Sequence, residues 1–171
     1  MNRDAWRIWT LAADEDGPVL SSPFTPRELR QQHTFPSPRV EATCGVPGLF
    51  GRTHRAPGAR CMCGLYAMPS LDELARVYPA EVVTGVRLHG RILPAPHFPV
   101  NFEGEIRAAG ATITGPGYIT PTLASHAPAL EARYGFSFTP DLDLALSIPD
   151  RLEKQASEYM AVLAESWGWG K

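Results

Sequence analysis

The segment 33–60 constrains the fold of this chain most, because it is too rich in proline and glycine for regular structure. It holds Pro36, Pro38, Pro47, Pro57, Gly45, Gly48, Gly51 and Gly58. Proline removes a backbone donor and glycine loosens the backbone, so neither a helix nor a long strand is expected there. A loop of this length inside a compact domain is functional, mobile, or held by something other than regular hydrogen bonding. We therefore expect an irregular loop over 33–60 that must be stabilised by something other than regular backbone hydrogen bonds.

All three cysteines lie in that loop or directly after it. Cys44, Cys61 and Cys63, with His54 between them, form the pattern C-x9-H-x6-C-x-C. Three thiolates and an imidazole are a complete tetrahedral ligand set for structural zinc, and a bound ion would keep the loop in one conformation. The C-x-C spacing is unusual, since zinc knuckles commonly place two or more residues between paired thiols. The pattern thus predicts a zinc site and leaves ordinary buried thiols, with no cofactor, as the alternative.

The same residues also allow a catalytic interpretation. Cys61 follows Arg60, and a cationic neighbour favours the nucleophilic thiolate. Cys61 or Cys63 with His54 as the base would form a thiol-dependent or metal-assisted enzyme, with Glu41 or Asp72 orienting the imidazole. Nothing in the sequence brings these groups together, so this hypothesis stays second to a non-enzymatic role.

Charge is unevenly distributed along the chain. The net charge is -2 and the sequence pI is about 6.2, so no global positive field attracts the whole molecule to nucleic acid. The segment 27–60 nevertheless carries six arginines against two glutamates. We expect this basic segment to contact a protein or a nucleic acid through its arginines, or else to be a solvated loop. The candidate partner-binding residues are Arg39, Arg52, Arg55 and Arg60.

Alternation of apolar residues predicts the strands, and caps predict the helices. The expected strands cover 5–12, 19–21, 61–68, 81–93 and 102–113. The last two should form a wide hairpin, with bulges at Gly85 and Gly90. The expected helices cover 25–32, 70–78, 123–134 and 149–167, and the third should start at Pro128 and end at Gly135.

These elements predict a single α+β domain over 1–171. Its core would be a small, strongly bent antiparallel sheet or partial barrel, with packed helices and the long Cys/His-containing loop. With 44% hydrophobic residues the chain can bury a core. No apolar run approaches the roughly eighteen residues of a membrane span, and the first ten residues lack signal-peptide order, so a cytoplasmic location is expected. The oligomeric state is not predicted.

The stretch 61–67, Cys-Met-Cys-Gly-Leu-Tyr-Ala, resembles a family of actinobacterial and actinophage proteins that share a C-x-C-G-[IL]-Y-A motif. Further points of similarity are Ala42-Thr43-Cys44, His54-Arg55-Ala56-Pro57, the strand around Gly85 to Ile92, and Arg107-Ala108 with Ala111. The chain departs from the family pattern at His89, where a tryptophan is usual. The resemblance implies that Cys44, His54, Cys61 and Cys63 form one group, and it implies no particular activity. Together these arguments favour a non-enzymatic binding or regulatory protein, stabilised by zinc.

Overall fold

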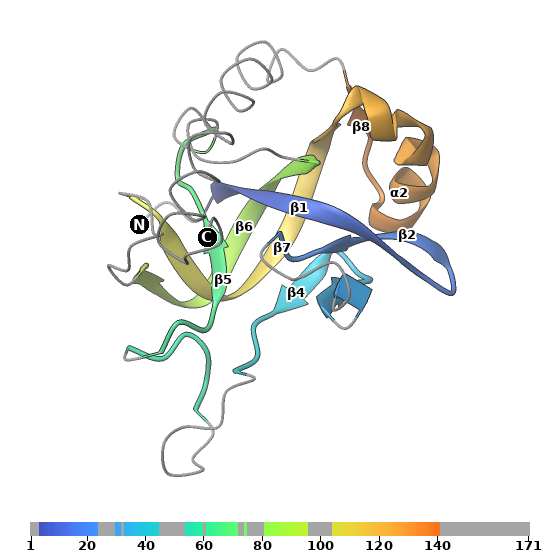
Figure 1. Ribbon diagram of the computed structural model, residues 1–171. Helices are drawn as coiled ribbons and strands as arrows, with labels where there is room; N and C mark the ends of the chain where they lie inside the picture. The colour runs from blue at the N-terminus through green and yellow to red at the C-terminus, as the bar shows by residue number, and fades with distance from the viewer. Residues whose placement is uncertain are drawn as a thin grey trace, which may run out of the picture.

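The computed structural model describes residues 4–23, 30–31, 33–44, 54–59, 61–71, 74, 81–95 and 104–140. Most of these residues belong to one eight-stranded sheet (Figure 1). Its strands are β1 (Asp4–Asp14), β2 (Gly17–Ser21), β3 (Thr34–Phe35), β4 (Arg39–Glu41), β5 (Leu65–Ala67), β6 (Val82–Pro94), β7 (Ile106–Ile119) and β8 (Phe138–Thr139). A 3-10 helix, η2 (Pro121–His126), leads directly into α2 (Ala127–Tyr134).

The sheet is ordered β3-β2-β1-β6-β7-β4, and β5 and β8 also pair with β7. Most pairs are antiparallel, whereas β8 runs parallel to β7. The expected hairpin is confirmed, since β6 and β7 pair from Val82 with Ile119 to Pro94 with Ile106. The expected bulges are confirmed as well, because the register shifts between Val83 and Gly85 and again between His89 and Ile92. Strand β7 thus meets four other strands and is the centre of the fold.

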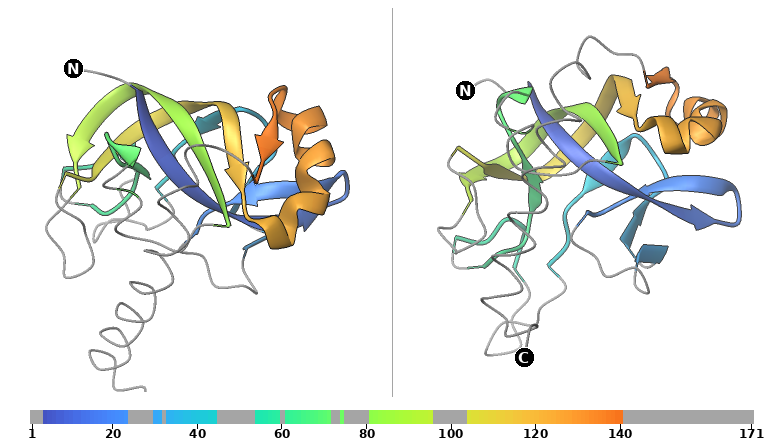
Figure 2. Two further views of the ribbon diagram at one scale, coloured as in Figure 1. Left: turned by 90° about the horizontal axis from the view of Figure 1, so that it is seen from above. Right: turned by 45° about the horizontal axis from the view of Figure 1, so that its top comes forward.

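The core is one cluster with residues from β1, β2, β4, β5, β6, β7, β8 and α2, and α2 packs against β2 and β8 at one end of the sheet (Figure 2). Trp9 is fully buried, donates from its indole nitrogen to Thr84 Oγ1 at 2.9 Å, and meets the ring of Phe35 edge-on at 5.3 Å. Leu130 and Tyr134 bring the buried face of α2 into the same cluster. Gly135 ends the helix in the left-handed conformation, as its position after the last apolar residue predicts.

The expected α+β class is wrong. The described part of the chain is mostly strand, with η2 and α2 as its one continuous helical stretch. The sheet is mixed and open, and it is not the small antiparallel sheet or partial barrel with packed helices that was expected. Strand β7 does not stop at Ile113 but continues through Gly115, Pro116 and Gly117, where β8 joins it in parallel. The helices expected over 25–32 and 149–167 contribute almost nothing to the described part of the chain.

Aromatic packing explains why glycines occur inside that strand. A Cβ at Gly117 would lie 2.6 Å from the ring of Phe138, and a Cβ at Gly115 would overlap the ring of Phe136. The two rings stack with centroids 4.9 Å apart. These glycines therefore admit rings that cover the end of the sheet, and they do not break the strand.

Several predicted elements fall on residues that are not fully described. The helices expected over 25–32 and 149–167 lie almost wholly outside the described residues. Of the helix expected over 70–78, Leu71 and Leu74 are helical, and Leu74 N donates to Ser70 O at 3.1 Å. Two short strands, β3 and β4, occur within the segment 33–60 that was expected to be irregular. Within the described ranges, no helix combines the length and apolar character that crossing a bilayer requires.

Candidate metal centre

The structure brings the three cysteines and His54 together. One ligand atom from each of Cys44, His54, Cys61 and Cys63 can be chosen so that all four lie within 4.8 Å of one another. Cys44 follows β4 and the other three precede β5, and these two segments leave the sheet on the same side (Figure 1). Because β4 and β5 both pair with β7, the sheet itself fixes the two ends of the loop that carries the ligands. The predicted convergence of these four residues is confirmed.

The spacing of the ligand atoms is close to that of a tetrahedral zinc site. With zinc–sulfur bonds of about 2.3 Å, two sulfurs on a tetrahedron lie about 3.8 Å apart, and a sulfur and an imidazole nitrogen lie about 3.6 Å apart. Cys44 Sγ and Cys61 Sγ are 3.7 Å apart, and His54 Nε2 lies 3.1 Å from Cys63 Sγ. Since no pair exceeds 4.8 Å, shifts of about 1 Å or less would complete the coordination shell.

A tight turn between Gly58 and Cys61 shapes one side of this centre. Cys61 N donates to Gly58 O at 3.1 Å, and Gly58 N donates to Cys63 Sγ at 3.3 Å. A Cβ at position 58 would lie only 2.5 Å from His54 Nε2, so the imidazole occupies space that only glycine leaves open. In the sequence Gly58 looks merely like a breaker of regular structure, but its missing side chain leaves the space that His54 occupies.

The C-x-C segment is held through its backbone as well. Tyr66 Oη donates to Met62 O at 2.6 Å, while Met62 itself is 47% exposed. The guanidinium of Arg107 donates to Cys61 O and, at 3.1 Å, to Cys63 O. Directly after this segment, Gly64 adopts φ +135°, a conformation that favours glycine, and the chain enters β5. Neither Tyr66 nor Arg107 was predicted to support the site, since their contacts depend on strand pairing.

The thiols of the C-x-C pair differ in acidity. Hydrogen bonding from the backbone of Cys63 lowers the pKa of the Cys61 thiol, and its contacts with the neighbouring thiols act in the same direction. Burial raises the pKa of the Cys63 thiol, which the hydrogen bond from Gly58 partly opposes. All three cysteines are half-buried and none forms a disulfide. Cys61 is therefore the more acidic thiol of the two, and His54 lies against the other one.

The predicted partner-binding arginines are only partly visible. Arg39 is 75% exposed at its side chain and pairs with Glu41 at 3.4 Å, and Arg55 is exposed next to the ligand His54. Glu41 also faces His89 at 3.9 Å, so its carboxylate is engaged at β4 and β6. Arg52 and Arg60 lie outside the described residues.

Comparison with known proteins adds no second line of evidence. No protein family, curated protein or solved structure matches the chain.

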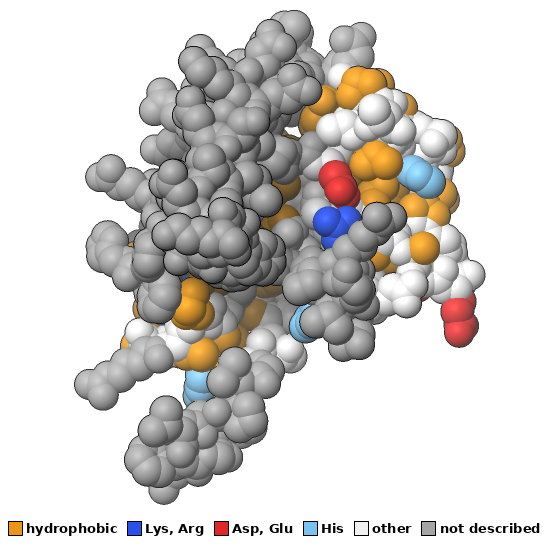
Figure 3. All heavy atoms as spheres, viewed as in Figure 1, with side chains coloured by type: hydrophobic (Ala, Val, Ile, Leu, Met, Phe, Trp, Pro, Cys, Tyr) orange, Lys and Arg blue, Asp and Glu red, His pale blue; other side chains and the backbone are white. Residues whose placement is uncertain are grey.

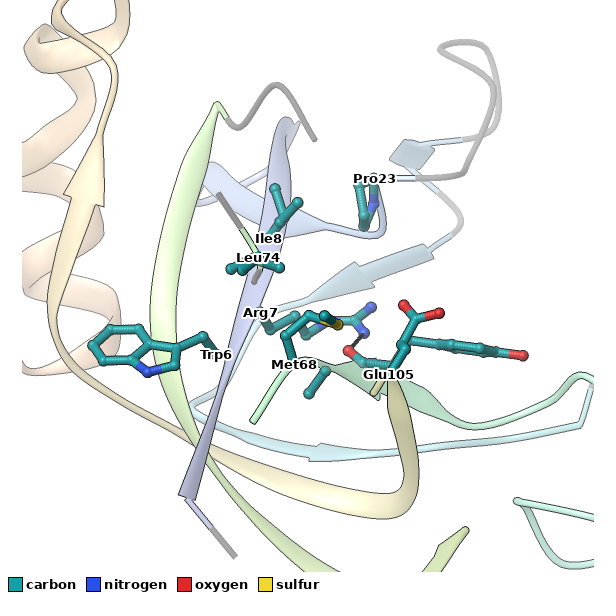
Figure 4. A pocket seen from close by; sticks show the side chains of 9 residues that line it. Trp6, Arg7, Ile8, Pro23, Met68, Leu74 and Glu105 are labelled. Carbon is teal, nitrogen blue, oxygen red and sulfur yellow. Dashed lines mark hydrogen bonds between the residues drawn. The ribbon is translucent and has the colours of Figure 1, made fainter. Parts of the chain in front are cut away.

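A pocket lined by residues of β1 and β5 offers little room for a metabolite (Figure 4). Its volume is about 20 Å³, which is room for one water molecule. Arg7 lies buried in its wall, directed toward Glu105, and its guanidinium sits 4.6 Å from the ring centre of Trp9. Burial lowers the pKa of Arg7 to about 10, an effect that the charge of Glu105 opposes. The guanidinium also donates to Tyr66 O, so Arg7 joins β1 to β5. The described lining residues are Trp6, Arg7, Ile8, Pro23, Tyr66, Ala67, Met68, Leu74 and Glu105.

Proposed function

We propose that this protein is a zinc-stabilised binding or regulatory protein without enzymatic activity. The observation that carries the proposal is the convergence of Cys44, His54, Cys61 and Cys63 within 4.8 Å. Structural zinc sites are closed by four protein ligands, whereas catalytic zinc sites keep a position open for water or substrate. Because this set already has four ligands, it supports a structural ion.

The donor atoms favour zinc over other common ions. Thiolates and imidazole suit zinc, while magnesium, calcium and manganese prefer oxygen ligands. Structural zinc in small domains contributes roughly 10–16 kcal/mol of apparent binding free energy at neutral pH, and that energy also stabilises the fold. Such a gain would fix the loop that proline and glycine leave without regular structure. A cytoplasmic location, where thiols stay reduced, would be consistent with this role.

We propose that the loop fastened by zinc presents arginines to a partner, which is a protein or a nucleic acid. Arg55 directly follows the ligand His54, so the ion would hold this arginine in place, and Arg39 extends from the nearby strand β4. On the face shown in Figure 3, the described residues present few lysine or arginine side chains. The arginines of segment 27–60 are the basic surface to test, and binding to a nucleic acid through them must weaken as salt rises.

The alternative is a thiol-dependent or metal-assisted enzyme, and one contact favours it. His54 Nε2 lies 3.1 Å from Cys63 Sγ, within reach for proton transfer. Yet burial raises the pKa of Cys63, while the thiol with the lowered pKa is Cys61. The base and the more acidic thiol are thus not the closest pair, which supports the non-enzymatic role.

Metal analysis of the purified protein tests the proposal. We expect about one equivalent of zinc per chain. Cobalt substituted for zinc should give thiolate charge-transfer bands and the d–d absorption of a tetrahedral ion. Cys44→Ser and Cys61→Ser should lose the ion, while Met62→Ala, which changes the exposed residue between two ligands, should retain it. A metal-free wild-type protein that does not take up added zinc would refute the proposed function.

The rate of alkylation separates the enzyme from the binding protein. With a structural zinc site, the thiols should react slowly until a chelator is added. A single cysteine that reacts fast at neutral pH in the metal-loaded protein, and only while His54 is present, would instead support an activated nucleophile.

A further inference from the structure

Arg107 joins the centre of the sheet to the two paired cysteines. It lies on β7 opposite Tyr66 of β5 on one side and Leu93 of β6 on the other. Its side chain is among the most completely buried in the described chain, with a relative exposure of 2%. A buried guanidinium is costly unless its donors are satisfied, so its hydrogen bonds report what the fold uses it for.

Those hydrogen bonds converge on backbone carbonyls near the metal centre. The guanidinium donates to Cys61 O, to Cys63 O at 3.1 Å, and to Pro94 O at 3.3 Å. Two of the three acceptors thus belong to the two paired ligands. Both cysteine carbonyls accept from the same nitrogen, Nη1, and Pro94 O accepts from Nε. Because these donors belong to one rigid planar fork, the guanidinium holds the three carbonyl oxygens in a fixed relation to one another.

We propose that Arg107 is a positioning residue of the metal centre, which sets the separation of Cys61 and Cys63 without touching the ion. This inference rests on the proposed zinc site. Only one residue separates the two cysteines, so the chain between them cannot orient both sulfurs through a longer turn. The backbone must instead be held by hydrogen bonds from other elements. Arg107 of β7 donates to the carbonyls of Cys61 and Cys63, and Tyr66 Oη of β5 donates to that of Met62.

Charge gives Arg107 a second effect on the loaded centre. A zinc ion with three thiolates and a neutral imidazole carries a formal charge of about -1, whereas the metal-free centre with protonated thiols is neutral. A buried cation nearby therefore stabilises the loaded centre more than the empty one. The same guanidinium also donates to Pro94 O, at the end of β6. Loading the centre should therefore stabilise this end of the β6–β7 pair as well as the loop.

Competition with a chromogenic chelator tests this inference on the full-length protein. Residues that orient metal ligands typically contribute roughly 10- to 100-fold to metal affinity. We expect Arg107→Met to weaken zinc binding by about that factor, and Arg107→Lys, which keeps the charge but lacks the fork, to weaken it less. The matched control is Arg87→Met on the neighbouring strand β6, because the Arg87 side chain is 68% exposed and pairs with Asp4 at 2.9 Å. The zinc affinity of this control variant should equal that of the wild type.

Cobalt spectra distinguish positioning from a general loss of stability. Altered sulfur positions should shift the d–d bands of the cobalt-loaded Arg107 variants, whereas a merely weakened fold would leave the bands of the loaded fraction unchanged. If Arg107→Met does not fold, Arg107→Lys decides the question. Wild-type affinity and wild-type cobalt bands in the folded Arg107 variants would overturn the inference. A wild-type protein that binds no zinc would instead overturn the proposed function itself.

Discussion

Replacing Gly58 by alanine should remove His54 from the metal centre, although position 58 is not a ligand. The new Cβ would lie 2.5 Å from His54 Nε2, whereas ordinary van der Waals contact begins at 3.4 Å. The imidazole must therefore retreat by about 0.9 Å, the difference between these distances. Metal–ligand distances vary by only about 0.2 Å in well-formed sites. The displacement is several times that tolerance, so the nitrogen should no longer reach the ion.

The backbone at this position should accept alanine. Gly58 is not among the described glycines with positive φ, and both of its hydrogen bonds use backbone atoms that alanine retains. The expected loss therefore comes from the side-chain overlap alone. We expect zinc affinity to fall by at least about tenfold, approaching the loss caused by His54→Ala.

A double-mutant cycle measured by zinc competition checks this reasoning. Gly58→Ala should weaken zinc binding strongly in the wild-type background and hardly at all in the His54→Ala background. Additive effects of the two changes would contradict the reasoning, because they would mean that position 58 acts on something other than the imidazole. Unchanged affinity of Gly58→Ala alone would show that the ligand set does not include His54 in this arrangement.

Four further predictions concern stability. Tyr134→Phe removes a hydroxyl that accepts from the buried Leu20 N–H at 2.9 Å. Chemical denaturation at neutral pH should therefore show a free energy of unfolding lower by about 2–3 kcal/mol. The control Tyr118→Phe should lose less than about 1 kcal/mol, because the Tyr118 hydroxyl has no hydrogen bond within the described chain. Burial raises the pKa of Tyr134 to about 12 from the ordinary value of 10; the fold therefore favours the protonated phenol, and wild-type stability should be complete below pH 10 and fall toward pH 12, a fall that Tyr134→Phe lacks. Asp14→Asn should destabilise the protein at neutral pH and progressively less as pH drops below about 4, because hydrogen bonding from Arg133 lowers the pKa of the Asp14 carboxyl; an unchanged difference at low pH would refute this coupling. Chelation of zinc should lower the thermal midpoint of the wild type reversibly and leave that of Cys61→Ser unchanged, as calorimetry can verify.

Local sequence signals determined the positions of several elements and the membership of the metal centre. Apolar alternation located β1 and the β6–β7 hairpin, since side chains on a strand point alternately to its two faces. Gly135 ended α2 because a helix commonly stops at a residue in the left-handed conformation. The four candidate ligands could be grouped because three thiols and an imidazole within or next to one breaker-rich segment make a complete tetrahedral ligand set.

Only the tertiary structure decided how far the strands extend and what braces the centre. The local sequence around Gly115 and Gly117 predicts the end of a strand. In the structure both glycines continue β7, because the rings of Phe136 and Phe138, which follow α2, pack onto them. Arg107 reaches Cys61 and Cys63 across more than forty positions of sequence, through strand pairing that no local pattern encodes. Propensity and periodicity act over a few residues, whereas close approach of a ring to a glycine, or of a guanidinium to a carbonyl, depends on which strands become neighbours. For this reason the sequence by itself could name the ligands, and the fold alone could show what holds them in place.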